Sequence, residues 1–408
     1  MPATPCDNEH ENLQCTPYDL EKPTQGWTRL GEMFNSDEPL WRNTWFLEGY
    51  NFSSNIYVIE DDGLTVIDPG NDYTAYLQFF DLGFDPAQVR RVMITHGHFD
   101  HAMGVLELCN YRGIREKGSM EIIIHEAGPE ELKKNLEPLS FPLRLVQGGE
   151  TVHTGRFSFQ VVHTPGHTFD GISLYHKETR SLFSGDAVLP YGLSAPDKHG
   201  GGRLDHMLQT FRNLLGMNID HVMPGHGWPV FGLGRKVLEA SYEEVIKHLL
   251  GVNRELSCEE AANRLIGKGL FEEALYCAEK SLQCGPSDAT AMLRLKIVCL
   301  NDMGRFQEAL ESLAVLKSIL PEADEEQEPF QSIATGYALM GLERYEEAVA
   351  VFDDVLTRHG RIKEALVYKG MALHLAGRHD EAMDIGEFRD EFVGRFKEEL
   401  MQKVTAKG

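Results

Sequence analysis

Short runs of aliphatic and β-branched residues recur between residues 55 and 223, separated by turns that often contain glycine or proline. Runs of this length and composition are typical of buried β-strands. They predict strands at residues 55–59, 64–67, 92–95, 121–125, 172–176, 181–183 and 221–223, and two more between residues 151 and 162. Residues 73–81 and 101–109 instead have the apolar spacing of helices. We therefore expect an α/β domain in this part of the chain.

Beyond residue 257 the pattern changes to a helical repeat. A short motif that ends in alanine recurs, and its alanines, Ala274, Ala309, Ala348 and Ala382, are 35, 39 and 34 residues apart. Pro286 and Pro321 follow the first two alanines by twelve residues, where a helix must stop. The period resembles that of tetratricopeptide repeats, whose paired helices stack into an array. A plain helical bundle is the alternative, because Glu-Glu-Ala is common on helices.

Composition agrees with two domains. The chain has 408 residues, of which 42% are hydrophobic and 25% charged. We expect a flexible N-terminus at residues 1–25, a catalytic domain at 26–255, the repeat domain at 256–394 and a helical tail at 395–408. The formal net charge of -24 disfavours nucleic acids and anionic membranes as partners.

Two further features concern the compartment. Residues 1–25 contain no apolar stretch that could serve as a signal peptide or membrane span. The seven cysteines are odd in number and form no Cys-x-x-Cys pair, which favours reduced thiols and a cytoplasmic location.

The candidate chemistry lies in loops that follow the predicted strands. The six residues that follow the strand at residues 92–95 include His96, His98, Asp100 and His101. Imidazole nitrogens and carboxylates are the ligands of zinc, iron and manganese. Similar loops carry His167 in Thr-Pro-Gly-His-Thr, Asp186 in Ser-Gly-Asp and His226 in Pro-Gly-His-Gly. Asp68, in Asp-Pro-Gly, either hydrogen-bonds the free ring nitrogen of a ligand or belongs to an ordinary turn.

These four motifs, in this order, resemble the metallo-β-lactamase superfamily over about residues 25–255. The resemblance implies an αββα sandwich with two divalent metal ions, zinc first and iron or manganese as alternatives. It implies one metal held by His96, His98 and His167 and a second held by Asp100, His101 and His226. Asp186 would bridge the two metals, and Asp68 would support a ligand through a hydrogen bond.

The complete ligand set resembles glyoxalase II and lactonase members of that superfamily. This resemblance implies hydrolysis of a thioester, a lactone or a related small acyl compound by a bridging hydroxide. Asp100 would act as the catalytic proton acceptor. The substrate-binding residues remain unassigned, and only as a hypothesis do Tyr191 and the glycine-rich residues 198–202 line the pocket.

Two alternatives stay open at this point. One is a mononuclear non-haem iron enzyme that resembles the persulfide dioxygenases, because two histidines and a carboxylate suit ferrous iron. The other is a non-enzymatic interaction protein with a structural metal site. The repeats would bind a peptide or protein partner, mediate self-association or cover the mouth of the active site.

Overall fold

The computed structural model describes residues 26–49, 52–71, 79–80, 82–117, 119–252, 256–286, 288–320 and 328–394. They divide into two compact units that adjoin in the sequence at Gly251 and Val252, and each unit is described by itself. The expected N-terminal segment at 1–25, the tail at 395–408 and most of the expected helix at 73–81 lie outside the described residues.

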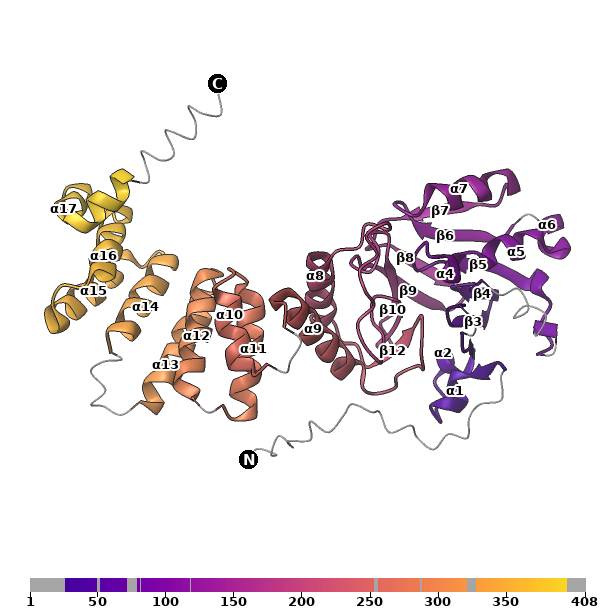
Figure 1. Ribbon diagram of the computed structural model, residues 1–408, viewed down its shortest axis with the longest axis horizontal. Helices are drawn as coiled ribbons and strands as arrows, with labels where there is room; N and C mark the ends of the chain where they lie inside the picture. The colour runs from indigo at the N-terminus through magenta and orange to yellow at the C-terminus, as the bar shows by residue number, and fades with distance from the viewer. Residues whose placement is uncertain are drawn as a thin grey trace, which may run out of the picture. The chain divides into compact units, whose positions relative to one another are not determined.

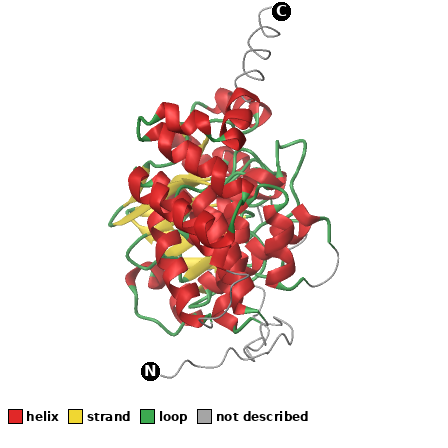
Figure 2. Ribbon diagram, turned by 90° about the vertical axis from the view of Figure 1, so that its left-hand side faces the viewer, coloured by secondary structure: helices red, strands yellow, loops and turns green. Residues whose placement is uncertain are grey.

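The first unit contains two β-sheets (Figure 1). In the seven-stranded sheet the first four strands pair antiparallel and the last four run parallel, in the order β1 (Thr28–Arg29), β2 (Thr44–Leu47), β3 (Ile56–Asp61), β4 (Gly63–Ile67), β5 (Val89–Met93), β6 (Glu121–His125) and β7 (Leu143–Val146). The five-stranded sheet has the order β12 (His221–Pro224), β11 (Ser181–Gly185), β10 (Ile172–His176), β9 (Phe157–His163) and β8 (Thr151–Thr154). All strands assigned within the described residues belong to this unit (yellow in Figure 2).

Alternation along the strands decides what lies between the sheets. Successive side chains of a strand point to opposite faces. Tyr57 and Ile59 of β3 therefore pack with Phe159 of β9 and Phe183 of β11 in a core between the two sheets. The residues in between, such as Val58, face a second core formed with the helices on the other side of the seven-stranded sheet.

Short helices complete the layers. The helices α4 (Phe99–Ala102), α5 (Gly104–Asn110), α6 (Arg112–Lys117) and α7 (Glu130–Leu136) contribute buried residues to the core on the seven-stranded sheet. The longer helices α8 (Leu204–Leu215) and α9 (Gly234–Leu250) lie beside the other sheet (Figure 1). Two single-turn helices, α1 (Leu30–Met33) and α2 (Pro39–Arg42), precede β2. The αββα sandwich that the motifs implied is confirmed.

The chain departs from the predicted pattern around the histidine motif. The strand expected at 92–95 ends at Met93, because the N–H of Thr95 donates to the carboxylate of Asp68 and its carbonyl accepts from Ile172 of the other sheet. The helix expected at 101–109 is divided at Met103 into α4 and α5. The pattern also missed the short strands β1, β2 and β7.

The described part of the second unit is helical, and consecutive helices pack against one another: α10 (Cys258–Ile266), α11 (Phe271–Cys284), α12 (Ala289–Asp302), α13 (Phe306–Ile319), α14 (Glu328–Gly341), α15 (Tyr345–His359), α16 (Lys363–Leu375) and α17 (His379–Asp384), with residues 386–394 also helical. The four repeated alanines are completely buried. A Cβ atom on Gly336 would lie 2.4 Å from the ring of Phe352, so only glycine allows this approach. Among the described helices, none combines the length and apolar composition that a bilayer span requires.

Candidate metal centre

The seven predicted ligand residues lie together at one edge of the sandwich, in loops that follow four of the strands. Their nitrogen and carboxylate oxygen atoms form three groups, and within each group the atoms lie within 4.8 Å of one another. The groups are His96, His98 and His167; His96, His101 and Asp186; and Asp100, His101 and His226. The structure therefore brings together every residue that the motifs singled out.

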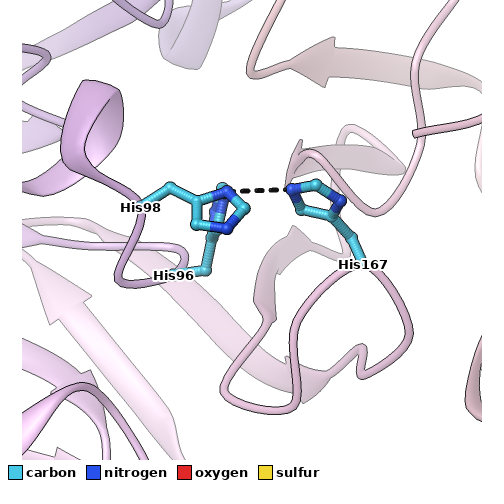
Figure 3. A group of neighbouring side chains, drawn as sticks. All are labelled: His96, His98 and His167. Atoms are coloured by element: carbon cyan, nitrogen blue, oxygen red, sulfur yellow. Dashed lines mark hydrogen bonds between the residues drawn. The ribbon is translucent and has the colours of Figure 1, made fainter. Parts of the chain in front are cut away.

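The first group consists of three imidazole rings. His96 and His98 follow β5, and His167 reaches them from the loop after β9 (Figure 3). His98 Nδ1 lies 3.0 Å from His96 Nε2 and 3.0 Å from His167 Nε2. These three nitrogens surround one point.

The group of Asp100, His101 and His226, called the second ligand group from here on, lies beside the first, and the group of His96, His101 and Asp186 shares a residue with each. Asp100 and His101 belong to the first turn of α4, and His226 follows β12. His226 Nε2 is 3.0 Å from Asp100 Oδ2 and 3.3 Å from His101 Nε2. Two nitrogens and one carboxylate oxygen thus meet at a second point.

Asp186 connects the two groups. Its Oδ2 is 3.6 Å from both His167 Nε2 and His226 Nε2, and its Oδ1 is 3.3 Å from His101 Nε2. Asp186 is 8% exposed, and no described residue donates a hydrogen bond of good geometry to Oδ1. A Cβ atom on Gly225 would lie 2.4 Å from that oxygen, so the glycine lets the loop of His226 approach the carboxylate.

Hydrogen bonds on the outer side of the rings decide the tautomers. His98 Nε2 donates to Asp197 Oδ2 at 3.0 Å, and His101 Nδ1 donates to Asp68 Oδ2 at 2.8 Å. His167 Nδ1 donates to a backbone carbonyl at 2.7 Å. When the outer nitrogen of a neutral imidazole carries the proton, the inner nitrogen presents a lone pair.

This arrangement fits metal ions. Lone pairs that face one another at 3.0 Å cannot hydrogen-bond, and a shared cation removes their repulsion. Burial lowers the pKa of His96 well below its ordinary value and also lowers that of His167, so both rings are neutral, as ligands must be. Burial opposes the charged form of His101, yet the carboxylates of Asp68 and Asp186 raise its pKa well above the ordinary value. The centre of the site therefore favours positive charge.

Asp68 makes the contacts of a supporting residue. Its Oδ1 accepts from the backbone N–H of Thr95 at 2.7 Å, and its Oδ2 accepts from the Thr95 hydroxyl at 2.7 Å as well as from His101. The Thr95 oxygen in turn lies 3.2 Å from His96 Nδ1. Asp68 also has φ = 50°, in the left-handed region, so the turn reading applies as well. Asp68 therefore both belongs to a turn and accepts a hydrogen bond from the ring of His101.

Sequence reasoning missed Asp197. This residue belongs to no motif, and no regular spacing relates it to the ligands. The only local signal was the run Pro-Asp-Lys-His-Gly, a typical turn composition. Sequence reasoning also missed Asp170, which is 7% exposed. Its Oδ2 accepts a hydrogen bond at 2.9 Å from the backbone N–H of Gly97, which lies between His96 and His98.

The residues suggested for the substrate pocket lie close to the ligands. The ring of Tyr191 is 66% exposed and lies against Gly227, the neighbour of His226. Within residues 198–202, the carbonyl of Gly200 accepts from the N–H of Phe169, two residues after His167. Their role in substrate binding stays a hypothesis.

Comparison with known proteins identifies both parts of the chain. Residues 49–226 match the family model of the metallo-beta-lactamase superfamily, and residues 333–387 match a tetratricopeptide repeat model. The hydroxyacylglutathione hydrolase GloC of Haemophilus influenzae is 28% identical over 186 residues, which cover 43% of this chain and 86% of that protein. The hydroxyacylglutathione hydrolase of Hydrogenovibrio crunogenus is 26% identical over 212 residues, which cover 51% of this chain and 68% of that protein.

Solved structures of the same superfamily are also similar. The BLEG-1 B3 metallo-beta-lactamase aligns with a TM-score of 0.38 and 23% identity, over 47% of this chain and 95% of its own. Residues 49–226 of the chain described here therefore form a metallo-beta-lactamase superfamily domain, and a tetratricopeptide repeat follows in the C-terminal part.

Proposed function

We propose that this protein is a dinuclear metal-dependent hydrolase of a thioester, a lactone or a related small acyl compound. The observation that carries the proposal is the pair of three-residue ligand groups joined by one carboxylate, Asp186. Zinc ions, or iron or manganese ions, at two such positions would lower the pKa of a bound water and polarise the carbonyl oxygen under attack. A structural metal needs only four ligands, so seven convergent side chains favour a catalytic role.

The chain's own groups suit acyl hydrolysis. The side chains of His226 and Asp100 are 39% and 26% exposed, whereas His96 is 4% exposed. His98 of the first group is also 30% exposed, so substrate would reach the site from the side on which His98, Asp100 and His226 face solvent. Burial alone would raise the pKa of Asp100, but its close contact with His226 and the neighbouring His101 lower it, so the carboxylate is ionised and able to accept a proton from an attacking water.

The named relatives support the acyl class. A hydroxyacylglutathione is a thioester, and two of the similar proteins carry that activity in their names. Thioesters and lactones are both hydrolysed by attack of water on an acyl carbonyl carbon, and a metal that polarises the carbonyl oxygen would serve both. These relatives cover 43% and 51% of this chain, and we leave the thiol part of the substrate open.

The test combines metal analysis with turnover. We expect about two zinc, iron or manganese ions per chain in protein purified without chelators, and hydrolysis of members of a thioester and lactone panel. His98→Ala should abolish turnover, and the matched control His153→Ala should not, because His153 is exposed and bonds only to Ser158 among the contacts the structure shows. One iron per chain with oxygen uptake on persulfides would instead establish the dioxygenase.

We propose that the repeat unit binds a peptide or protein partner or a second copy of the chain. The support is the tetratricopeptide match at residues 333–387. Light scattering of the full chain over a range of concentrations separates self-association from a monomer that needs another partner.

A cytoplasmic location is part of the proposal, because no disulfide joins any of the five cysteines in the described residues.

A further inference from the structure

The loop at residues 194–202 holds two of the three histidines of the first ligand group. It follows Asp186 in the sequence and contributes no ligand itself. Asp197 Oδ2 accepts from His98 Nε2 at 3.0 Å. His167 Nδ1 lies 2.7 Å from the carbonyl oxygen of Ala195 and 2.7 Å from the hydroxyl of Ser194. One loop thus orients two rings that come from separate parts of the chain.

The loop is itself held in place by its backbone. The N–H of Asp197 donates to the carbonyl of His167 at 2.7 Å, and the N–H of Gly202 donates to the carbonyl of Asp197 at 2.6 Å. A Cβ atom on Gly202 would lie 2.1 Å from that His167 oxygen, so only glycine permits the close approach. The carboxylate of Asp197 also accepts the N–H groups of His199 and Gly200, at 2.9 and 3.0 Å. These bonds orient the carboxylate toward His98 without the help of a ligand.

The second ligand group has a different support. His101 donates to Asp68, which is 2% exposed and accepts a hydrogen bond from the backbone N–H of Thr95, two residues after β5. Among the bonds shown by the described residues, none links Asp197 to Asp100, His101 or His226. The carboxylate in the loop after β11 therefore bonds directly to the first group alone, whereas Asp68 at the end of β4 bonds directly to His101 and reaches His96 only through the Thr95 hydroxyl.

We propose that Asp197 is a positioning residue for His98, and that the loop at residues 194–202 sets the metal affinity of the first position independently of the second. This inference rests on the proposed function, because it assumes that both groups hold metal. A carboxylate behind an imidazole holds the ring in one tautomer and makes its inner nitrogen more basic. Loss of such a partner typically weakens metal binding about 10–100-fold.

The experiment measures metal affinity at each position. Metal-free wild type, Asp197→Asn and Asp197→Ala are titrated with Zn²⁺ against a chromophoric chelator, and bound metal per chain is measured after dialysis. The control is Asp205→Asn, an exposed carboxylate nearby in the sequence that pairs with Arg203. We expect the Asp197 variants to keep one tight site and to lose about 10–100-fold in affinity at the other.

The outcomes separate the two proposals. If wild type binds two ions and the Asp197 variants bind both with unchanged affinity, the positioning role is wrong and the dinuclear hydrolase stands. Equal weakening of both positions would also overturn it, because the loop would then act on the whole site. If wild type itself takes up no metal, the proposed function fails together with the inference. Thermal unfolding of the metal-free proteins shows whether a variant has merely failed to fold.

Discussion

Replacing Asp68 by asparagine isolates the charge behind His101. Asparagine has the size of aspartate and also tolerates the left-handed backbone that residue 68 adopts, with φ = 50°. Its amide oxygen can still accept the N–H of Thr95, which lies 2.7 Å from Asp68 Oδ1. Its NH₂ group then faces His101 Nδ1, at the 2.8 Å that now separates Asp68 Oδ2 from this nitrogen. Because two donors repel, the neutral ring of His101 in this variant carries its proton on Nε2, the nitrogen that faces the ligand group.

The size of the effect follows from these contacts. A hydrogen bond to a charged group contributes about 1.5–3 kcal/mol, and the variant loses the one from His101. The proton on Nε2 must leave before a metal binds, so we expect affinity at the second position to fall about 10–100-fold, as for other lost partners of ligating histidines. That range corresponds to about 1.4–2.7 kcal/mol.

Chelator competition with Zn²⁺ measures this loss. Asp68→Asn should weaken the position formed by Asp100, His101 and His226 more than the position formed by His96, His98 and His167, which Asp68 reaches only through the Thr95 hydroxyl. Asp205→Asn, which removes an exposed carboxylate, should change neither. Wild-type affinity at both positions in Asp68→Asn would refute the tautomer argument, since the charge behind the ring would then be irrelevant to the ligand.

Three other predictions concern packing, pH and metal removal. Gly336→Ala should destabilise the helical unit by about 1–3 kcal/mol in chemical denaturation, because its Cβ would lie 2.4 Å from Phe352, whereas Gly394→Ala, with open space around it, should not. His221 accepts the N–H of Gly232, and burial lowers its pKa from 6.5 to about 4. The unfolded chain then takes up the proton first, so stability should fall between pH 6.5 and 4 by up to about 1.4 kcal/mol per pH unit; a His221→Gln variant that shows the same decline would contradict this. A chelator should abolish turnover and added Zn²⁺, Mn²⁺ or Fe²⁺ should restore it; turnover that survives complete metal removal would exclude the hydrolase proposed here.

The hydrophobic pattern predicted an element correctly where its residues are buried and of similar type. The strand at 121–125 was predicted at its observed bounds, because a run of isoleucines buried on both faces of a central strand has no polar position to interrupt it. The hairpin of β3 and β4 was predicted for the same reason. The repeated alanines identified the helical unit, since close helix contacts leave room for only small side chains there.

Hydrogen bonds between residues far apart in the sequence could not be predicted from the hydrophobic pattern. The strand β5 ends at Met93 because the backbone of Thr95 hydrogen-bonds to Asp68, 27 positions before it, and to Ile172, 77 positions after it. Nothing within the run of apolar residues records those partners. The strand β7 was missed because its outer residues are exposed at the edge of the sheet, so that its run is short and mixed.

The sequence by itself determined the order of strands and repeats and the chemical types in the four ligand motifs, because these depend on neighbours in the chain and on what each side chain can bind. It also placed the candidate ligands at the ends of strands. Only the tertiary structure decided which nitrogen of each histidine faces inward, since that choice depends on Asp68, Asp197 and a backbone carbonyl from other loops. Folding alone brings those acceptors to the rings, and so it decides which nitrogens are available to the two metal positions proposed here.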